Sequence, residues 1–147
     1  MRLERYNFRW SLEFPQYEFE SIGPKGRIVK VVRFNRMKGS KDLYNLAFGD
    51  LDKSTGEIDD FVTSDNNDRE KVLATVADTV INFTQQKPEA SIFATGSTGA
   101  RTRLYRIGIF LHWREISAIF CVWGFIDGKW EFFQPNKPYE AFLVKRQ

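Results

Sequence analysis

Residues 95–106 read Thr95-Gly96-Ser97-Thr98-Gly99-Ala100-Arg101-Thr102-Arg103-Leu104-Tyr105-Arg106, and here a strand is expected to turn into a helix. The first turn of a helix presents backbone N–H groups without acceptors and the positive end of the helix dipole, which together attract anions. Ser97 or Thr98 can cap this helix, and Gly96 and Gly99 let a ligand approach the backbone closely. Arginine at a helix N-terminus opposes the dipole, so three arginines need another reason, and a bound anion supplies one.

The sequence therefore predicts a phosphate site at this turn. Arg103 and Arg106 are three residues apart and are neighbours on the helix surface, where guanidinium and backbone N–H groups can meet one phosphate. The alternative is that the arginines pair with acidic residues from the middle of the chain, for example Asp59, Asp60 or Asp65. The predicted ligand-binding residues are Gly96, Ser97, Thr98, Arg101, Thr102, Arg103 and Arg106.

No established motif is complete at this turn. It lacks the Gly-Lys pair of a P-loop and the glycines two residues on either side of a serine that form a nucleophile elbow. Its Gly-Ser-Thr-Gly sequence fits the loop that clamps RNA in KH domains, but that loop joins two helices. The turn therefore predicts anion binding in general and no particular nucleotide-binding or hydrolase family.

Two helices are expected around this turn. The helix after Thr98 extends to about His112 and is expected to face the core with Leu104, Ile107 and Leu111. An earlier helix is expected to open with a capping box formed by Asn67 and Glu70. Its apolar residues recur at helical spacing: Val72, Leu73, Val76, Ala77, Val80 and Phe83.

The remaining segments alternate apolar and polar residues, as strands do. Asp127 and Gly128 predict a type I′ hairpin turn. Runs of hairpins with segregated helices predict a single α+β domain over residues 1–147, with a largely antiparallel sheet, two helices and the order ββββ-α-β-α-ββ(β). The expected strands are 6–12, 17–22, 27–37, 43–51, 57–63, 91–95, 116–126, 129–133 and 139–145.

Composition limits the class of protein. A chain of 147 residues suits one domain, and its single cysteine, Cys121, excludes an internal disulfide framework. The N-terminus lacks the apolar core of a signal peptide, and no apolar run approaches the roughly 20 residues of a membrane helix. We therefore expect a cytoplasmic, soluble protein with no membrane association and no cofactor.

Charge is unevenly distributed along the chain. Residues 1–41 carry 10 basic and 4 acidic side chains, residues 42–90 carry 4 and 11, and residues 91–147 carry 8 and 4. The basic outer thirds favour an anionic partner, either nucleic acid or a phosphorylated ligand. The same layout would allow a homodimer in which the acidic segment of one copy meets the basic segments of another.

Candidate catalytic residues are few. His112 is the only histidine, so any imidazole base must be this residue, and Tyr105 could also move protons. His112 could equally cap the helix C-terminus or form part of a surface. Cys121 lies in an apolar run typical of a buried small hydrophobe. The carboxylates of Asp50, Asp52, Asp59 and Asp60 could gather a cation but are more typical of solvated hairpin ends, so no metal site is predicted.

The arginine turn, Tyr6-Asn7-Phe8 and Phe19-Glu20-Ser21-Ile22-Gly23-Pro24-Lys25-Gly26 together resemble a bacterial family of short proteins classed as a domain of unknown function. The resemblance spans nearly the whole chain, and the arginine turn is its most specific part. It implies a compact single domain in the bacterial cytosol. It carries no known activity.

Three functions follow from these observations. The first is a module that binds phosphate or nucleic acid at the arginine turn. The second is a toxin-like ribonuclease or other phosphoryl-transfer enzyme, with Arg103 and Arg106 stabilising the transition state and His112 or Tyr105 moving protons. The third is a protein–protein interaction module.

Overall fold

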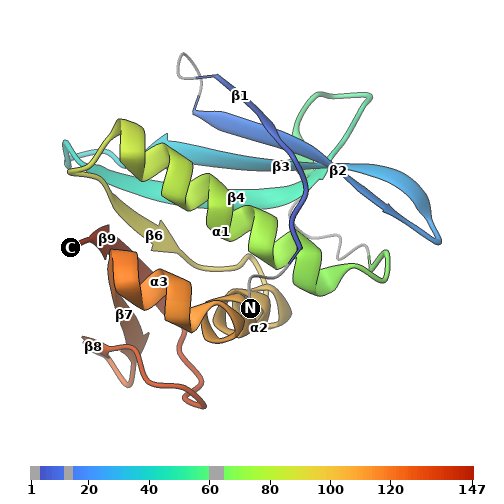
Figure 1. Cartoon of the computed structure of the whole chain (residues 1–147). Coiled ribbons are helices and arrows are strands. Elements are labelled where there is room, and N and C mark those ends of the chain that lie inside the picture. Colours follow the sequence, from blue (N-terminus) through green and yellow to red (C-terminus); the bar gives the residue numbers. More distant parts are fainter. Residues whose placement is uncertain (1–3, 12–14, 60–64) are drawn as a thin grey trace.

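Strands from both halves of the chain join into one sheet (Figure 1). The computed structural model describes residues 4–11, 15–59 and 65–147. Neighbouring strands follow the order β1-β2-β3-β4-β6-β9-β7-β8, and β5 pairs with β4. The strands are β1 (Arg9–Ser11), β2 (Gln16–Gly23), β3 (Gly26–Arg36), β4 (Leu43–Leu51), β5 (Ile58–Asp59), β6 (Ser91–Ala94), β7 (Phe120–Ile126), β8 (Lys129–Phe132) and β9 (Ala141–Arg146).

The sheet is antiparallel apart from one pair of strands. Among the described residues, β4 and β6 run parallel, and the other pairs of neighbours run antiparallel. The chain passes through α1 (Arg69–Gln86) between β4 and β6, and a parallel pair requires such a crossover. The expectation of an α+β fold with a largely antiparallel sheet is confirmed.

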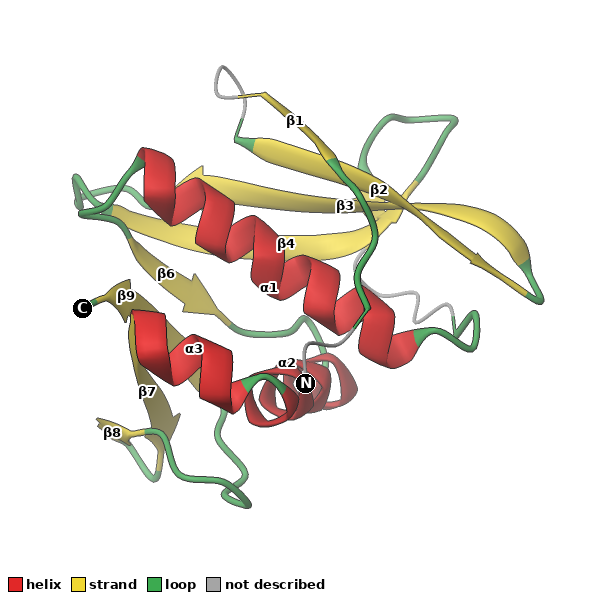
Figure 2. Ribbon diagram, in the orientation of Figure 1, coloured by secondary structure: helices red, strands yellow, loops and turns green. Residues whose placement is uncertain are grey.

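Three helices cover one face of the sheet: α1, α2 (Gly99–Leu111) and α3 (Trp113–Ile119) (Figure 2). The core lies between them and the strands. Phe34 of β3 stacks on Phe83 of α1 with ring centroids 4.3 Å apart. Tyr105 of α2 and Ile116 of α3 belong to the same buried cluster. None of the helices in the described residues combines the length and the apolar character needed to cross a membrane.

The expectation of two helices is wrong, because residues 113–119 form a third. His112 has φ −108° and ψ 19°, which ends α2, and α3 begins at the next residue. The strand expected over 116–126 starts four residues later, at Phe120. The apolar residues Trp113, Ile116 and Ile119 are three apart, a helical spacing that the continuous apolar run after them hides.

The face that α2 turns to the core also differs from the expectation. Leu104, Ile107 and Leu111 are only half-buried. The buried residues of α2 lie on the neighbouring face, together with the helix-ending His112: Arg101, Thr102, Tyr105 and Gly108. A buried stripe with an arginine, a threonine, a glycine and a histidine has no apolar periodicity to reveal it.

The start of α1 is not a capping box. Its N-cap is Asp68, which makes no side-chain cap hydrogen bond, and Asn67 has a positive φ of 61°. The Asp68 carboxylate instead accepts hydrogen bonds from the hydroxyls of Tyr6 and Ser21. This carboxylate therefore connects the start of the helix to β2 and to the segment before β1.

The hairpin predicted at Asp127 and Gly128 is confirmed. Both residues have positive φ, 52° and 75°, as a type I′ turn requires. Two predicted strands extend past the described residues: Leu12 at the end of the first, and residues 60–63 at the end of the strand expected over 57–63. The described part of the latter is β5.

Candidate functional site

A concavity of about 650 Å³ lies where α2 begins. The loop between β6 and α2 forms one side, and the segment that leads into β9 forms the other. Six of the seven predicted ligand-binding residues line it, and Arg101 does not. The lining residues are Thr95, Gly96, Ser97, Thr98, Gly99, Thr102, Arg103, Arg106, Pro138, Tyr139 and Glu140.

Two threonine hydroxyls hold this loop in shape. Thr98, one of the two predicted caps, is the N-cap of α2, and its Oγ1 accepts a hydrogen bond from the Arg101 N–H at 3.1 Å. Thr102 Oγ1 accepts from the Gly96 N–H at 3.0 Å and donates to the Thr98 carbonyl at 3.2 Å. Both hydroxyls therefore already bond within the loop. Their main contribution to the concavity is to fix its backbone.

Gly96 is needed by the loop itself. A Cβ at this position would lie 2.4 Å from the Thr102 nitrogen and 2.6 Å from the Arg101 Cβ. At Gly99 a Cβ would meet nothing within 4 Å. The two glycines look equivalent in the sequence, but of the two only Gly96 lies where neighbouring chain atoms leave no room for a side chain.

Arg103 and Arg106 place two positive charges on the concavity. Arg103 is exposed, and Arg106 is half-buried with a long bond of 3.4 Å from its Nη1 to the Lys137 carbonyl. Neither arginine forms an ion pair with a described carboxylate. The alternative pairing with Asp59 or Asp65 is therefore not seen for these two arginines. Asp60 lies outside the described residues.

Arg101 lies in a different place from the other two arginines. Its side chain is 4% exposed, and its guanidinium group lies over the Phe48 ring at 5.2 Å. It lines a separate cavity of about 190 Å³, together with the buried Lys30, which is paired with Asp50. The sequence placed all three arginines at one site, and the structure divides them between two.

The opposite rim is formed by Pro138, Tyr139 and Glu140, in the segment before β9. Lys137 Nζ and the Tyr139 hydroxyl both donate to Glu131 Oε2, each at 2.8 Å. The bond from Lys137 lowers the pKa of Glu131, and the carboxylate in turn raises the pKa of Lys137. Burial raises the pKa of Tyr139, and the bond to Glu131 contributes to the same rise to a lesser extent. No pattern in the sequence indicated this rim, which also brings the exposed carboxylate of Glu140 to the concavity.

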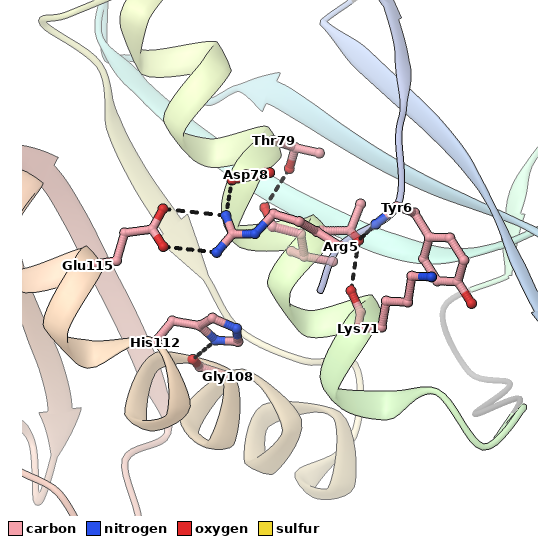
Figure 3. A network of polar contacts seen from close by, with 10 residues as sticks. Arg5, Tyr6, Lys71, Asp78, Thr79, Gly108, His112 and Glu115 are labelled. Atoms are coloured by element: carbon pink, nitrogen blue, oxygen red, sulfur yellow. Dashed lines mark hydrogen bonds and ion pairs between the residues drawn. The ribbon is translucent and has the colours of Figure 1, made fainter. Parts of the chain in front are cut away.

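The catalytic candidates His112 and Tyr105 are not among the residues that line the concavity. Tyr105 is 7% exposed and lines an apolar cavity of about 80 Å³ under the helices. His112 is 6% exposed, and its Nδ1 lies 2.8 Å from the Gly108 carbonyl (Figure 3). This contact makes Nδ1 the protonated nitrogen, and Nε2 is buried without a hydrogen bond to any described residue.

Beside His112, Arg5 connects two helices (Figure 3). Its guanidinium group pairs with Asp78 of α1 and, at 2.8 Å, with Glu115 of α3. All three side chains are at least partly covered, and that of Arg5 is 11% exposed. These residues are 73 and 110 positions apart in the sequence, so no local pattern could have found the network. Within the described residues, no group of three or more His, Cys, Asp or Glu side chains is placed to hold a metal ion.

The chain resembles one family over almost its whole length. No curated protein and no solved structure matches it. One family model matches residues 2–147, and that family has no assigned activity. The match spans far more than half of the sequence, so the chain belongs to the family of unknown function DUF6934.

Proposed function

We propose that this protein binds the phosphate group of a small ligand in the concavity at the start of α2. One observation carries the proposal: two arginines without an ion-pair partner among the described carboxylates line the same concavity as the N-terminus of a helix. Its volume, about 650 Å³, is in the range of small-molecule sites.

The backbone offers hydrogen-bond donors at the same place. Gly99 and Ala100 are the first two residues of α2, and no described residue accepts a hydrogen bond from their N–H groups. The Thr98 cap engages the next N–H group, that of Arg101. A phosphate at this end of α2 would receive two backbone N–H bonds and charge-assisted bonds from Arg103 and Arg106.

Glu140 acts against anion binding. Its exposed carboxylate lies on the rim, so an incoming phosphate meets one negative charge beside the two positive ones. Removing this charge should strengthen binding, which gives the proposal a gain-of-affinity test as well as a loss-of-affinity test.

We would titrate the protein with pyrophosphate and with ATP by isothermal titration calorimetry. Each of Arg103→Ala and Arg106→Ala should weaken binding about tenfold, the effect of one charge-assisted hydrogen bond. Glu140→Gln should strengthen it. Arg114→Ala is the matched control, because Arg114 is an exposed arginine on α3 outside the concavity. Absence of binding, or equal affinity in the four variants, would refute the proposal.

Nucleic acid is the competing ligand, and a salt series separates it from a small phosphate. Binding of a single-stranded oligonucleotide through many phosphates should fall steeply with added salt, whereas a single phosphate site should weaken only modestly. If oligonucleotides bind tightly with a steep salt dependence, and neither pyrophosphate nor ATP binds, the concavity is a nucleic-acid interface and our proposal is wrong. The phosphoryl-transfer alternative has less support, because His112 and Tyr105 are buried away from the concavity.

A further inference from the structure

The sheet face opposite the helices carries a cluster of aromatic side chains near its β8 edge. Trp123 stacks on Phe132 with centroids 5.8 Å apart, and Trp130 contacts Phe125 at 5.2 Å and Phe93 at 6.2 Å. The two residues on β8 are the most exposed of these. Phe132 is 68% and Trp130 45% exposed. Large exposed aromatic residues on an edge strand indicate a surface that binds another strand or another protein.

The backbone of the same two residues points outward. Ile126 and Lys129 flank the two-residue turn and form the first hydrogen-bonded pair of the β7–β8 hairpin. Because such pairs alternate, Glu131 bonds to β7, whereas Trp130 and Phe132 direct their N–H and C=O groups away from it. The bond from the Phe133 N–H to the Val122 carbonyl at 3.0 Å fits this alternation. The Phe132 carbonyl lies 3.4 Å from the Tyr139 hydroxyl, and no described backbone group pairs with the outer edge of β8.

The charged residues of β8 would complement those of a second β8 strand that runs antiparallel to it. Lys129 and Glu131 lie on either side of Trp130 and share the opposite face of the strand. In an antiparallel pair of two β8 strands with Trp130 opposite Trp130, Lys129 of each copy lies directly opposite Glu131 of the other. The outward-pointing groups of Trp130 then form the central hydrogen-bonded pair, and the Lys–Glu pairs occupy the closer, non-hydrogen-bonded positions.

We propose that β8 binds β8 of a second copy of this chain about a two-fold axis at Trp130, so that two sheets join into one. The Glu131 carboxylate can take part without losing its own contacts, because Lys137 and Tyr139 both bond to Oε2. No described donor bonds to Oε1, so Oε1 can receive Lys129 of the other copy. Lys129 is exposed and makes no ion pair with a described residue.

A second copy fits this edge better than an unrelated apolar segment. An apolar strand would place neutral residues opposite Lys129 and Glu131, whereas β8 itself supplies both opposite charges in one register. Phe132 then lies opposite Gly128 and diagonal to Trp130 of the other copy, a separation that aromatic side chains can bridge. The proposal concerns another surface than the phosphate concavity and does not depend on ligand binding.

Charge reversal tests the register. Lys129→Glu places two Glu–Glu pairs across the axis and should raise the dimer dissociation constant about tenfold or more in sedimentation equilibrium. Glu131→Lys places two Lys–Lys pairs there and should do the same. An equimolar mixture of the two variants should form heterodimers, because a strand with two glutamates then faces a strand with two lysines. Lys53→Glu, an exposed charge reversal in the loop between β4 and β5, is the matched control and should leave the dimer unchanged.

Amide hydrogen exchange gives a second readout that does not depend on substitutions. On going from dilute to concentrated wild-type protein, the amides of Trp130 and Phe132 should gain protection, and the Gly56 amide, which bonds within its own loop, should not change. Because Lys129 is exposed, loss of the dimer in Lys129→Glu cannot be ascribed to unfolding when the circular dichroism spectrum is retained. A monomer at all concentrations would overturn the proposal, as would a dimer that tolerates both charge reversals.

Discussion

Gly96 lies where the loop before α2 comes back against the first turn of its own helix. Its Cβ, if present, would be 2.4 Å from a backbone nitrogen, a separation that side chains do not tolerate. Gly96→Ala should therefore displace the loop and lower the free energy of unfolding by about 1 to 3 kcal/mol, the usual effect of an overpacked site. Urea denaturation followed by fluorescence measures this change.

Gly99→Ala is the matched control, because the added methyl group would meet nothing within 4 Å. Gly99 is the first residue of α2, and alanine favours the helix over glycine by up to about 1 kcal/mol. The variant should therefore be as stable as the wild type or slightly more stable. Equal losses of stability in the two variants would contradict the contact geometry of Gly96.

Arg101, Arg103 and Arg106 illustrate how far a residue's role can be predicted from its type. The pattern of residues limited the N-cap to Ser97 or Thr98 and correctly placed the arginines in the first turns of the helix. It could not say which way each side chain points, because this depends on how α2 rotates about its axis. Here the rotation buries Arg101 against Phe48 and leaves Arg103 exposed.

At the scale of elements, the rotation of α2 could not be predicted, because several of its buried residues are of types that are usually exposed. Strand positions were predictable because apolar and polar residues alternate, and the expected strands 17–22, 27–37 and 43–51 correspond closely to β2, β3 and β4. The core face of α2 was not predictable, because Arg101, Gly108 and His112 lie on it. The break between α2 and α3 was missed because residues 113–126 form one long, mostly apolar stretch.

Arg5 joins two elements that no sequence pattern connects. Arg5→Met would keep the aliphatic part of the side chain and leave the partly buried carboxylates of Asp78 and Glu115 without their guanidinium partner. We expect a loss of about 2 kcal/mol in the free energy of unfolding, below the value for a fully buried pair. Urea denaturation at neutral pH would measure it.

A surface ion pair provides the comparison for Arg5. Arg27 pairs with Glu20 at 2.8 Å, but their side chains are 72% and 44% exposed. Arg27→Met should therefore change stability by less than about 0.5 kcal/mol. If Arg5→Met has an effect this small, the contact between α1 and α3 rests on apolar packing and not on the arginine.

At the scale of the whole molecule, two antiparallel groups of strands meet at the parallel pair within the described sheet. The first group comprises β1 to β5, and the second comprises β6, β9, β7 and β8. Between β4 and β6 only three residue pairs are in register, the central one being Tyr44 and Ile92. The buried cluster nevertheless continues across this junction, from Tyr17 on β2 to Phe142 on β9. The core, more than the backbone pairing, joins the two groups.

This continuity predicts that both groups of strands unfold together. Phe34 lies in the first group, is 1% exposed and stacks on Phe83 of α1. Phe34→Leu should destabilise the protein by about 1 kcal/mol.

In the Trp10→Phe background, the remaining tryptophans, Trp113, Trp123 and Trp130, follow the first group of strands in the sequence. Their fluorescence should shift to a lower urea midpoint in Phe34→Leu by the same amount as the far-ultraviolet circular dichroism, because one cooperative core unfolds in a single step. A lower midpoint in circular dichroism alone, with tryptophan fluorescence unchanged, would mean that the parallel junction separates two independently folding units.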